Sequence, residues 1–185
     1  VMYSLAERHG WKFMVFSAEN PIPIHVGKLA EKRIGKSILA NGSATDDEYY
    51  AGLSWVDDHF RFADASVDTS LSSIFERAEA CMEEIDISGL VIDPFNYVGL
   101  PSDMTETVQI SNMLTELRKL ATQHQVHVFI VAHPTKMYRA NGGDIPHVGP
   151  YDISSSAHWF NKADFGSTVS RIDGVTRLNV WKCRL

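Results

Sequence analysis

Residues 89–93 read Gly89-Leu90-Val91-Ile92-Asp93, a short apolar run that ends in a carboxylate. Runs of this length are typical of strands buried on both faces of a sheet. Two further runs, residues 12–17 and 126–132, have the same character, and amphipathic helical patterns lie between the three. This alternation predicts an α/β fold, a mainly parallel central sheet with helices on both of its faces.

The remaining elements follow from periodicity and turn residues. Helices are expected over about 2–9, 24–34, 45–59 and 71–85, and over a further segment that includes Ile110 and Leu120. A brief strand is expected at 60–63, and two late strands, near 166–172 and 176–182, flank the hairpin dipeptide Asp173-Gly174. A chain of 185 residues fits one domain, so residues 1–185 are expected to form a single domain.

Composition excludes several classes of protein. The chain is 44% hydrophobic and 22% charged, as globular domains are, and no apolar run approaches the length of a membrane span. Cys81 and Cys183 are far apart and are interpreted as reduced thiols. The net charge of −6 argues against a small basic nucleic-acid binder, so any contact with nucleic acid must come from local loops or from several copies of the chain.

Three of the predicted strands lead to titratable residues. The strand at 12–17 leads to Glu19, the strand at 89–93 ends in Asp93, and the strand at 126–132 leads to His133. Ligands of open parallel sheets bind beyond the carboxyl ends of the strands, so these three residues are candidates for one site.

Each of the three residues has two interpretations. Asp93 either holds Mg²⁺ through water, as in a Walker B strand, or caps the turn at Pro94. Glu19 is either a general base that activates water or a solvated loop residue. His133 either senses a phosphate or is a structural histidine bonded to the backbone.

A Walker B site requires a phosphate loop of the form GxxxxGK[ST]. Gly35-Lys36-Ser37 matches the last three positions, but Ala30 stands where the first glycine should be, and helix-forming residues precede the match. A phosphate loop turns sharply from a strand into a helix so that its amides face the phosphates. We therefore reject this match, and expect the chain to be a fragment whose phosphate loop lies before Val1.

Five segments occur in an order and at spacings that suggest a known family. They are SAENP at 17–21, VIDPFN at 91–96, VAHP at 131–134, SSSAHWFNKAD at 154–164 and WKCRL at 181–185. These segments resemble motifs of the DnaB-like, RecA-fold (superfamily 4) replicative helicases, most closely the primase–helicase branch that includes phage helicases and Twinkle.

The resemblance implies a RecA-like three-layer α/β/α sandwich, truncated at both ends, and a role for each matching residue. Glu19 would be the catalytic base, Asp93 would bind Mg²⁺ through water, and His133 would sense the γ-phosphate. Arg184, together with Lys182, would reach the nucleotide of the adjacent protomer, and Arg171 would be a second arginine near the phosphates. The DNA-binding candidates are Lys136, Arg139, Asn141, Gly142 and Lys162, with Asn161 less certain. For Lys136 and Arg139 a solvated surface charge is an equally good interpretation.

The implied parent protein is an ATP-dependent DNA helicase that uses ATP or another NTP with Mg²⁺. It would translocate 5′–3′ on single-stranded DNA as a homo-hexamer and unwind duplex, with a primase domain or partner. The alternatives are a RecA-type recombinase or repair ATPase that forms filaments, and a non-catalytic scaffold with the same fold. Without a phosphate loop, residues 1–185 alone are expected to be inactive. The expected location is the cytoplasm of a bacterium or phage-infected cell rather than a mitochondrion.

Overall fold

A computed structural model of the chain describes residues 1–38, 44–134, 148–153, 157–172 and 174–184. These residues form two compact units. The first consists of residues 1–99 and 120–131, and the second of residues 100–119 and 132–185. The expectation of a single domain stays a prediction.

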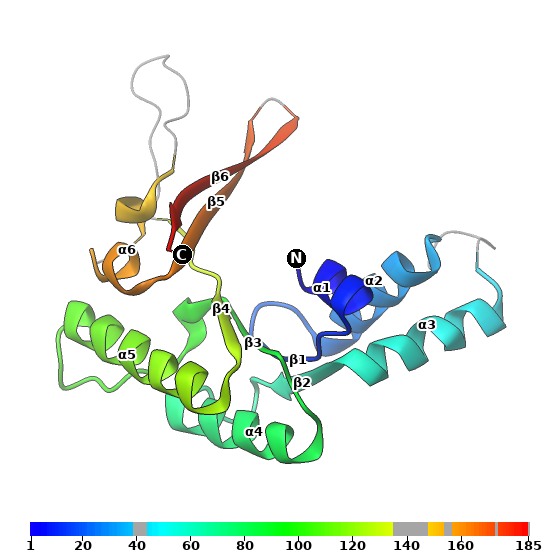
Figure 1. The fold of residues 1–185 in the computed structure, drawn as a ribbon, viewed down its shortest axis with the longest axis horizontal. Helices are drawn as coiled ribbons and strands as arrows, with labels where there is room; N and C mark the ends of the chain where they lie inside the picture. Colours follow the sequence, from blue (N-terminus) through cyan, green and yellow to red (C-terminus); the bar gives the residue numbers. More distant parts are fainter. Residues whose placement is uncertain (39–43, 135–147, 154–156, 173, 185) are drawn as a thin grey trace. The chain divides into compact units, whose positions relative to one another are not determined.

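The first unit is built on a four-stranded sheet (Figure 1). Its strands are β1 (Phe13–Ser17), β2 (Phe60–Asp64), β3 (Gly89–Asp93) and β4 (His127–Ile130). They are arranged in the order β2-β1-β3-β4, and every neighbouring pair is parallel. The predicted parallel α/β fold is therefore confirmed, and the strand at 60–63 joins the same sheet.

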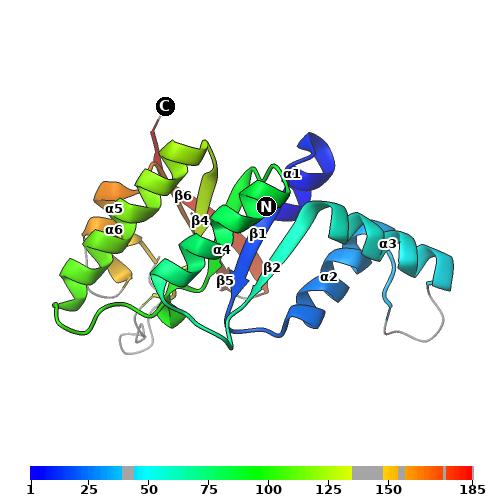
Figure 2. The same cartoon turned by 90° about the horizontal axis from the view of Figure 1, so that it is seen from below.

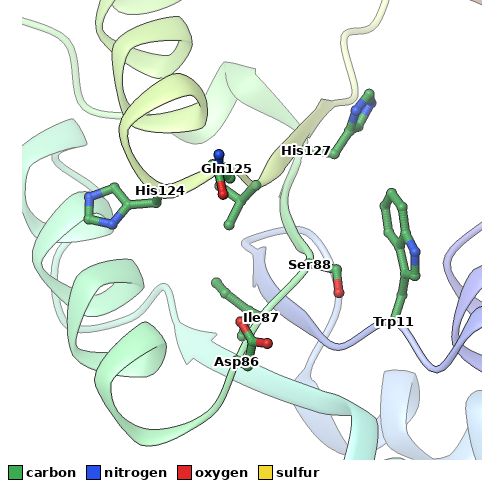
Figure 3. A pocket seen from close by; sticks show the side chains of 8 residues that line it. Trp11, Asp86, Ile87, Ser88, His124, Gln125 and His127 are labelled. Atoms are coloured by element: carbon green, nitrogen blue, oxygen red, sulfur yellow. The ribbon is translucent and has the colours of Figure 1, made fainter.

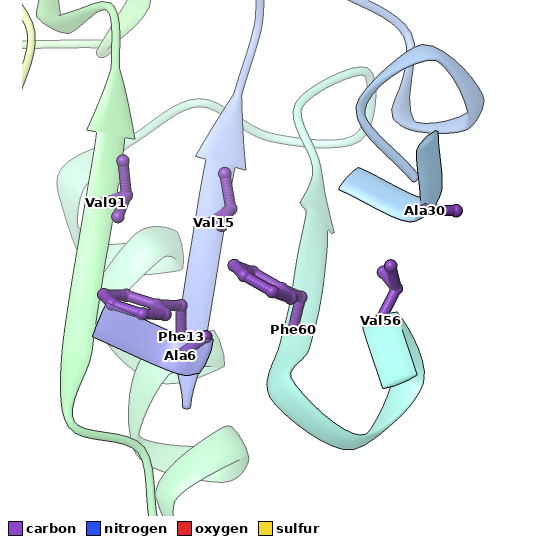
Figure 4. Packing of buried hydrophobic residues seen from close by; sticks show 7 residues of the cluster. All are labelled: Ala6, Phe13, Val15, Ala30, Val56, Phe60 and Val91. Atoms are coloured by element: carbon purple, nitrogen blue, oxygen red, sulfur yellow. The ribbon is translucent and has the colours of Figure 1, made fainter. Parts of the chain in front are cut away.

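Helices cover both faces of this sheet. They are α1 (Met2–His9), α2 (Ile22–Ile34), α3 (Asp46–His59) and α4 (Leu71–Glu84). Side chains alternate between the two faces along a strand. One face of the strands packs against α1, α2 and α3 in a single apolar cluster, shown in Figure 4: Ala6, Phe13, Val15, Ala30, Val56, Phe60 and Val91. Helix α4 contacts β1 and β2 and lies on the opposite side of the strands from α1 (Figures 1 and 2).

Close approach between strands explains one glycine of the predicted Walker B run. A Cβ atom on Gly89 would lie only 2.7 Å from the Phe13 ring of β1. The absence of a side chain there lets the aromatic ring pack flat over the start of β3. Phe13 also stacks on Phe60 of β2, with ring centroids 5.6 Å apart, so this ring ties three strands together.

Strand β4 differs from the prediction in length and burial. The apolar run at 126–132 predicts a fully buried strand, but β4 covers only His127–Ile130, and its residues are half-buried. The reason is its position, because β4 is an outer strand of the four that the structure describes, with β3 on one side. The ladder nevertheless continues one residue further, since the Val131 amide donates to the Ile92 carbonyl at 2.9 Å.

The second unit contains most of α5 (Glu106–His124), the 3-10 turn η2 (Pro150–Asp152), the short helix α6 (His158–Lys162), and a hairpin of β5 (Phe165–Ile172) and β6 (Val175–Cys183). The hairpin is antiparallel, as predicted, and Gly174 at its turn has φ 79°. Gly166 is required because the Trp181 ring occupies the space of a Cβ atom. Among the described residues, no helix is long and apolar enough to cross a membrane.

Candidate active site

Carboxylates flank the end of the central strand β1. Ser17, its last residue, is in register with Asp93 of β3 on one side and with Asp64 of β2 on the other. Because all three strands are parallel, these residues lie together at the edge where the strands end, which we call the carboxyl edge. The predicted placement of the 12–17 and 89–93 strand ends at one edge is thus confirmed.

Glu19 lies two residues beyond the end of β1, in the loop that leads to α2, and is exposed. The preceding residue, Ala18, donates its backbone amide to the Asp93 carbonyl at 3.3 Å. This bond extends the β1–β3 pairing one step past the strand end. It brings the backbone next to Glu19 directly alongside Asp93, which is the neighbourhood that a base and a metal-binding carboxylate require.

Asp93 is half-buried at the last position of β3. The turn that follows, η1 (Phe95–Tyr97), begins after Pro94 and has no side-chain cap, so the capping interpretation of Asp93 does not hold. Backbone bonds anchor the turn instead, since the Phe95 amide donates to the Val131 carbonyl of the neighbouring chain segment at 2.9 Å. The Asp93 carboxylate is therefore left at the carboxyl edge without a capping role.

His133 is exposed and belongs to the second unit. It follows Val131, the last residue of the first unit, by two positions. The adjacent Pro134 forms a bridge with Ile153 within the second unit. The clustering of His133 with Glu19 and Asp93 stays a prediction.

The rejected Gly35-Lys36-Ser37 match lies at the end of a helix, not at the start of one. Gly35 is the left-handed C-cap of α2, with φ 70°. Lys36 forms an ion pair with Glu48, and the Ser37 hydroxyl donates to Glu31 at 2.9 Å. A helix C-terminus presents carbonyl oxygens, which repel phosphates, so the rejection is confirmed.

Lys162, a predicted DNA contact, is engaged inside the second unit. Its ammonium group donates to the Ser111 carbonyl at 2.7 Å, to the Ser111 hydroxyl at 2.8 Å and to the Thr115 hydroxyl at 2.5 Å. An ammonium group has three protons, and these bonds use all of them. A phosphate contact by Lys162 would require this attachment of α6 to α5 to open.

Lys182 and Arg184, the predicted residues that act on a neighbouring protomer, also have partners within the second unit. The Lys182 ammonium donates to the Phe160 carbonyl and lies 4.7 Å from the centre of the Phe160 ring. The Arg184 guanidinium lies 3.4 Å from the Asp164 carboxylate, and Arg118 pairs with the same carboxylate at 3.5 Å. The Arg184 side chain is nevertheless 50% exposed.

The remaining predicted residues are placed less fully. Arg171 is exposed on β5, in register with Thr176 of β6. Asn161 is exposed on α6. The other DNA-binding candidates, Lys136, Arg139, Asn141 and Gly142, lie outside the described residues.

Sequence reasoning missed three residues at or near the carboxyl edge. Ser17 is buried there, and its hydroxyl lies 2.8 Å from Nε2 of His25 in α2. Asp64 ends β2, and its pKa is lowered chiefly because the Ser66 amide donates to its carboxylate at 2.8 Å. The strand order β2-β1-β3 would have identified Asp64, but a sequence alone does not state strand order.

A cavity lies at the opposite edge of the sheet. It has a volume of about 490 Å³ and is lined by residues that precede or begin β1, β3 and β4, shown in Figure 3: Trp11, Asp86, Ile87, Ser88, His124, Gln125, Val126 and His127. Because it opens where the strands begin, it is separate from Glu19 and Asp93.

The donors at the carboxyl edge fit magnesium better than a fully protein-bound metal. In the part of the chain that the structure describes, no group of three or more His, Cys, Asp or Glu side chains could enclose a metal ion. Mg²⁺ in phosphoryl-transfer sites keeps several waters and is bound by one or two carboxylates together with substrate phosphates. One half-buried carboxylate, that of Asp93, matches this requirement.

Comparisons with known proteins agree with this architecture. No protein-family model matches the chain. It is 37% identical over 175 residues, 88% of its length, to "Twinkle homolog protein, chloroplastic/mitochondrial" from Arabidopsis thaliana, and spans 24% of that protein.

Two solved structures share the fold. The ATPase domain of a DnaB-like helicase superposes with a TM-score of 0.78 at 14% identity, over 99% of this chain and 70% of that one. A DnaB-like replicative helicase, described with its interactions with primase, superposes with a TM-score of 0.75 at 13% identity, over 95% of this chain and 47% of that one. The chain therefore has the fold of the DnaB-like helicase ATPase domains, and its similarity to a Twinkle homolog confirms the resemblance to the Twinkle branch.

Proposed function

We propose that the chain is part of the ATPase motor of a hexameric replicative DNA helicase, which translocates 5′–3′ on single-stranded DNA and unwinds duplex. The observation that carries this proposal is the pairing of β1 with β3 at the carboxyl edge. The register of Ser17 with Asp93, and the bond from Ala18 to Asp93, place the backbone beside Glu19 next to a second carboxylate. The fold and the 37% identity to a Twinkle homolog supply the reaction class.

The two carboxylates would divide the chemistry of phosphoryl transfer. Asp93 would hold Mg²⁺ through water, and the ion supplies positive charge to the phosphates of ATP or another NTP when it is bound. Glu19, on a loop outside the sheet, would accept a proton from the attacking water. The exposed position of Glu19 suits this role, because the base must reach the solvent side of the nucleotide.

The second unit would supply the residues that respond to the nucleotide. His133 would sense the γ-phosphate, and Arg184, with Lys182, would act on the nucleotide of a neighbouring protomer. Arg171 would be the second arginine near the phosphates. The half-exposed Arg184 supports this assignment, because a residue that acts on a neighbour must be accessible from outside its own subunit.

DNA binding would come from the loop after His133, through Lys136, Arg139, Asn141 and Gly142. Lysine, arginine and backbone amides follow phosphates without reading bases, as translocation requires. Lys162 is a weaker candidate because its three protons are already used.

Partner and location are also proposals. One structural neighbour is a DnaB-like helicase described with primase, so a primase domain or partner is proposed here. We keep the cytoplasm of a bacterium or phage-infected cell as the proposed location. The name of the Arabidopsis thaliana relative points instead to organelles, and a fluorescent fusion imaged in the source cell would decide between them.

The test uses the full-length protein. ATP hydrolysis should require Mg²⁺ and increase with single-stranded DNA, and forked duplexes with a free 5′ tail should be unwound. Glu19→Gln should reduce hydrolysis by about 10²–10⁴-fold while nucleotide binding persists, because the base acts on water rather than on the phosphates. Glu7→Gln, the same change at an exposed position on α1, is the matched control and should leave turnover unchanged. Filaments on DNA instead of rings in electron micrographs would favour a recombinase, and normal turnover in Glu19→Gln would remove this residue from the mechanism.

A further inference from the structure

A buried hydroxyl at the carboxyl edge lies close to the proposed base. Ser17 is the last residue of β1 and is only 6% exposed, and among the described residues it is the buried polar residue of the core. A buried polar group of this kind requires a hydrogen-bond partner to offset the loss of solvation. Its partner is Nε2 of His25, at 2.8 Å.

His25 is itself held by two elements besides its own helix. It lies in the first turns of α2, and its ring stacks on Phe62 of β2 with centroids 6.1 Å apart and planes 26° apart. The hydrogen bond to Ser17 connects it to β1. The start of α2 has no side-chain cap, so the Ser17–His25 bond is a side-chain link between this end of the helix and the sheet.

The chain between Ser17 and His25 includes the loop that carries Glu19. At the strand end of this loop, Ala18 is fixed by its backbone bond to Asp93. At the helix end, the Ile24 amide donates to the Pro21 carbonyl at 3.0 Å, which begins the helix that His25 continues. Glu19 therefore sits in a loop of four residues, 18–21, closed by a side-chain bond across its base.

We infer that the Ser17–His25 hydrogen bond positions the Glu19 loop, so that His25 and Ser17 are positioning residues for the proposed hydrolysis. Neither residue needs to contact the nucleotide. Their effect is to keep the base at a fixed distance from the water that it activates, where a displacement of about 1 Å can cost about 10²-fold in rate. The catalytic part of this inference rests on the proposed function, whereas the structural part does not.

Four variants of the full-length protein separate this role from general stability. Ser17→Ala and His25→Leu each remove the bond, and His25→Gln keeps a polar nitrogen or oxygen at the reach of Nε2. The matched control is His59→Leu, because His59 is also half-buried in the first unit, bonds through Nδ1 to the Trp55 carbonyl at 2.8 Å and stacks on Trp55.

Two measurements are made on each variant. The first is hydrogen–deuterium exchange of residues 18–25, which should become faster in Ser17→Ala and His25→Leu but not in His25→Gln or His59→Leu. The second is ATPase kinetics, in which the two disrupting variants should lower kcat by about 10–100-fold with KM for ATP within about twofold of wild type. The double variant should be no slower than the slower single variant, because both changes remove the same bond.

The outcomes are distinct. Unchanged exchange of residues 18–25 in His25→Leu overturns the inference, as do additive effects of the two changes on kcat. If the loop exchanges faster but wild-type protein hydrolyses no ATP, the link between Ser17 and His25 stands and the proposed function fails. If the loop loosens and kcat is unaffected, the positioning role is wrong while the proposed function survives.

Discussion

Ser17 of β1 lies in register with Asp93 of β3, and the amide of the next residue, Ala18, donates to the Asp93 carbonyl. Neighbouring strands are about 4.8 Å apart, so the loop carrying Glu19 begins within one strand spacing of Asp93. Two carboxylates that start this close, one half-buried and one exposed, are in different environments. That difference suits a metal-binding acid beside a solvent-facing base.

The first prediction concerns Asp93. Asp93→Asn in the full-length protein should abolish Mg²⁺-dependent hydrolysis while the fold persists, because the amide keeps the shape of the side chain but removes the charge that holds the ion. The measurement is a titration of ATPase activity against Mg²⁺, with circular dichroism as the check on folding. A normal Mg²⁺ dependence would show that Asp93 does not serve the metal.

The second prediction concerns Lys36, in the rejected phosphate-loop match. Lys36→Ala should leave nucleotide affinity and turnover unchanged, because the residue lies at the C-terminal end of α2 and pairs with Glu48. Loss of this exposed ion pair should cost at most about 1 kcal/mol of unfolding free energy. A large loss of ATP binding would mean that the motif had been rejected wrongly.

The strands of the sheet could be predicted because a short, uninterrupted apolar run such as Phe13–Ser17 or Gly89–Asp93 suits a strand covered on both faces. The placement of Glu19 and Asp93 near one edge followed, because parallel strands must end together. Asp64 and the Ser17–His25 bond were missed, because both depend on strand order and on the packing of α2. Nor could the sequence reveal that Lys162 is satisfied by Ser111 and Thr115, which are about fifty residues earlier in the chain.

The third prediction separates the two roles of Lys162. Lys162→Gln should lower the unfolding free energy by about 1–3 kcal/mol, because it removes charged hydrogen bonds between α6 and α5. Affinity for single-stranded DNA, measured by fluorescence anisotropy, should change by less than about twofold. Lys119→Gln, in an exposed pair with Glu116, is the control and should change neither quantity appreciably. A large fall in DNA affinity with unchanged stability would instead restore Lys162 to the DNA-binding set.

The fourth prediction concerns the two thiols. Burial raises the pKa of Cys81, whereas Cys183 is exposed. Since the thiolate is the reactive form, a raised pKa leaves Cys81 with less thiolate at any pH below it. At pH 8 a thiol reagent should therefore label Cys183 first, and Cys81 only on unfolding or at higher pH. Mass spectrometry of partially labelled protein measures the order, and equal rates would contradict the burial of Cys81.

The last prediction decides between the two interpretations of Arg184. Within its own chain the guanidinium pairs with Asp164, and a half-exposed pair of this kind contributes at most about 1 kcal/mol to stability. An arginine that stabilises the charge developing on a neighbour's phosphoryl group contributes about 10³–10⁵ in rate. Asp164→Asn removes the partner charge but keeps Arg184, so it should cost little activity. Arg184→Ala subunits mixed into wild-type rings should inactivate adjacent wild-type sites, so that activity falls faster than the mutant fraction rises. A strictly proportional fall, equal in size to that produced by Asp164→Asn subunits, would mean that Arg184 serves only its pair with Asp164, because a residue confined to its own subunit cannot affect the sites of its neighbours.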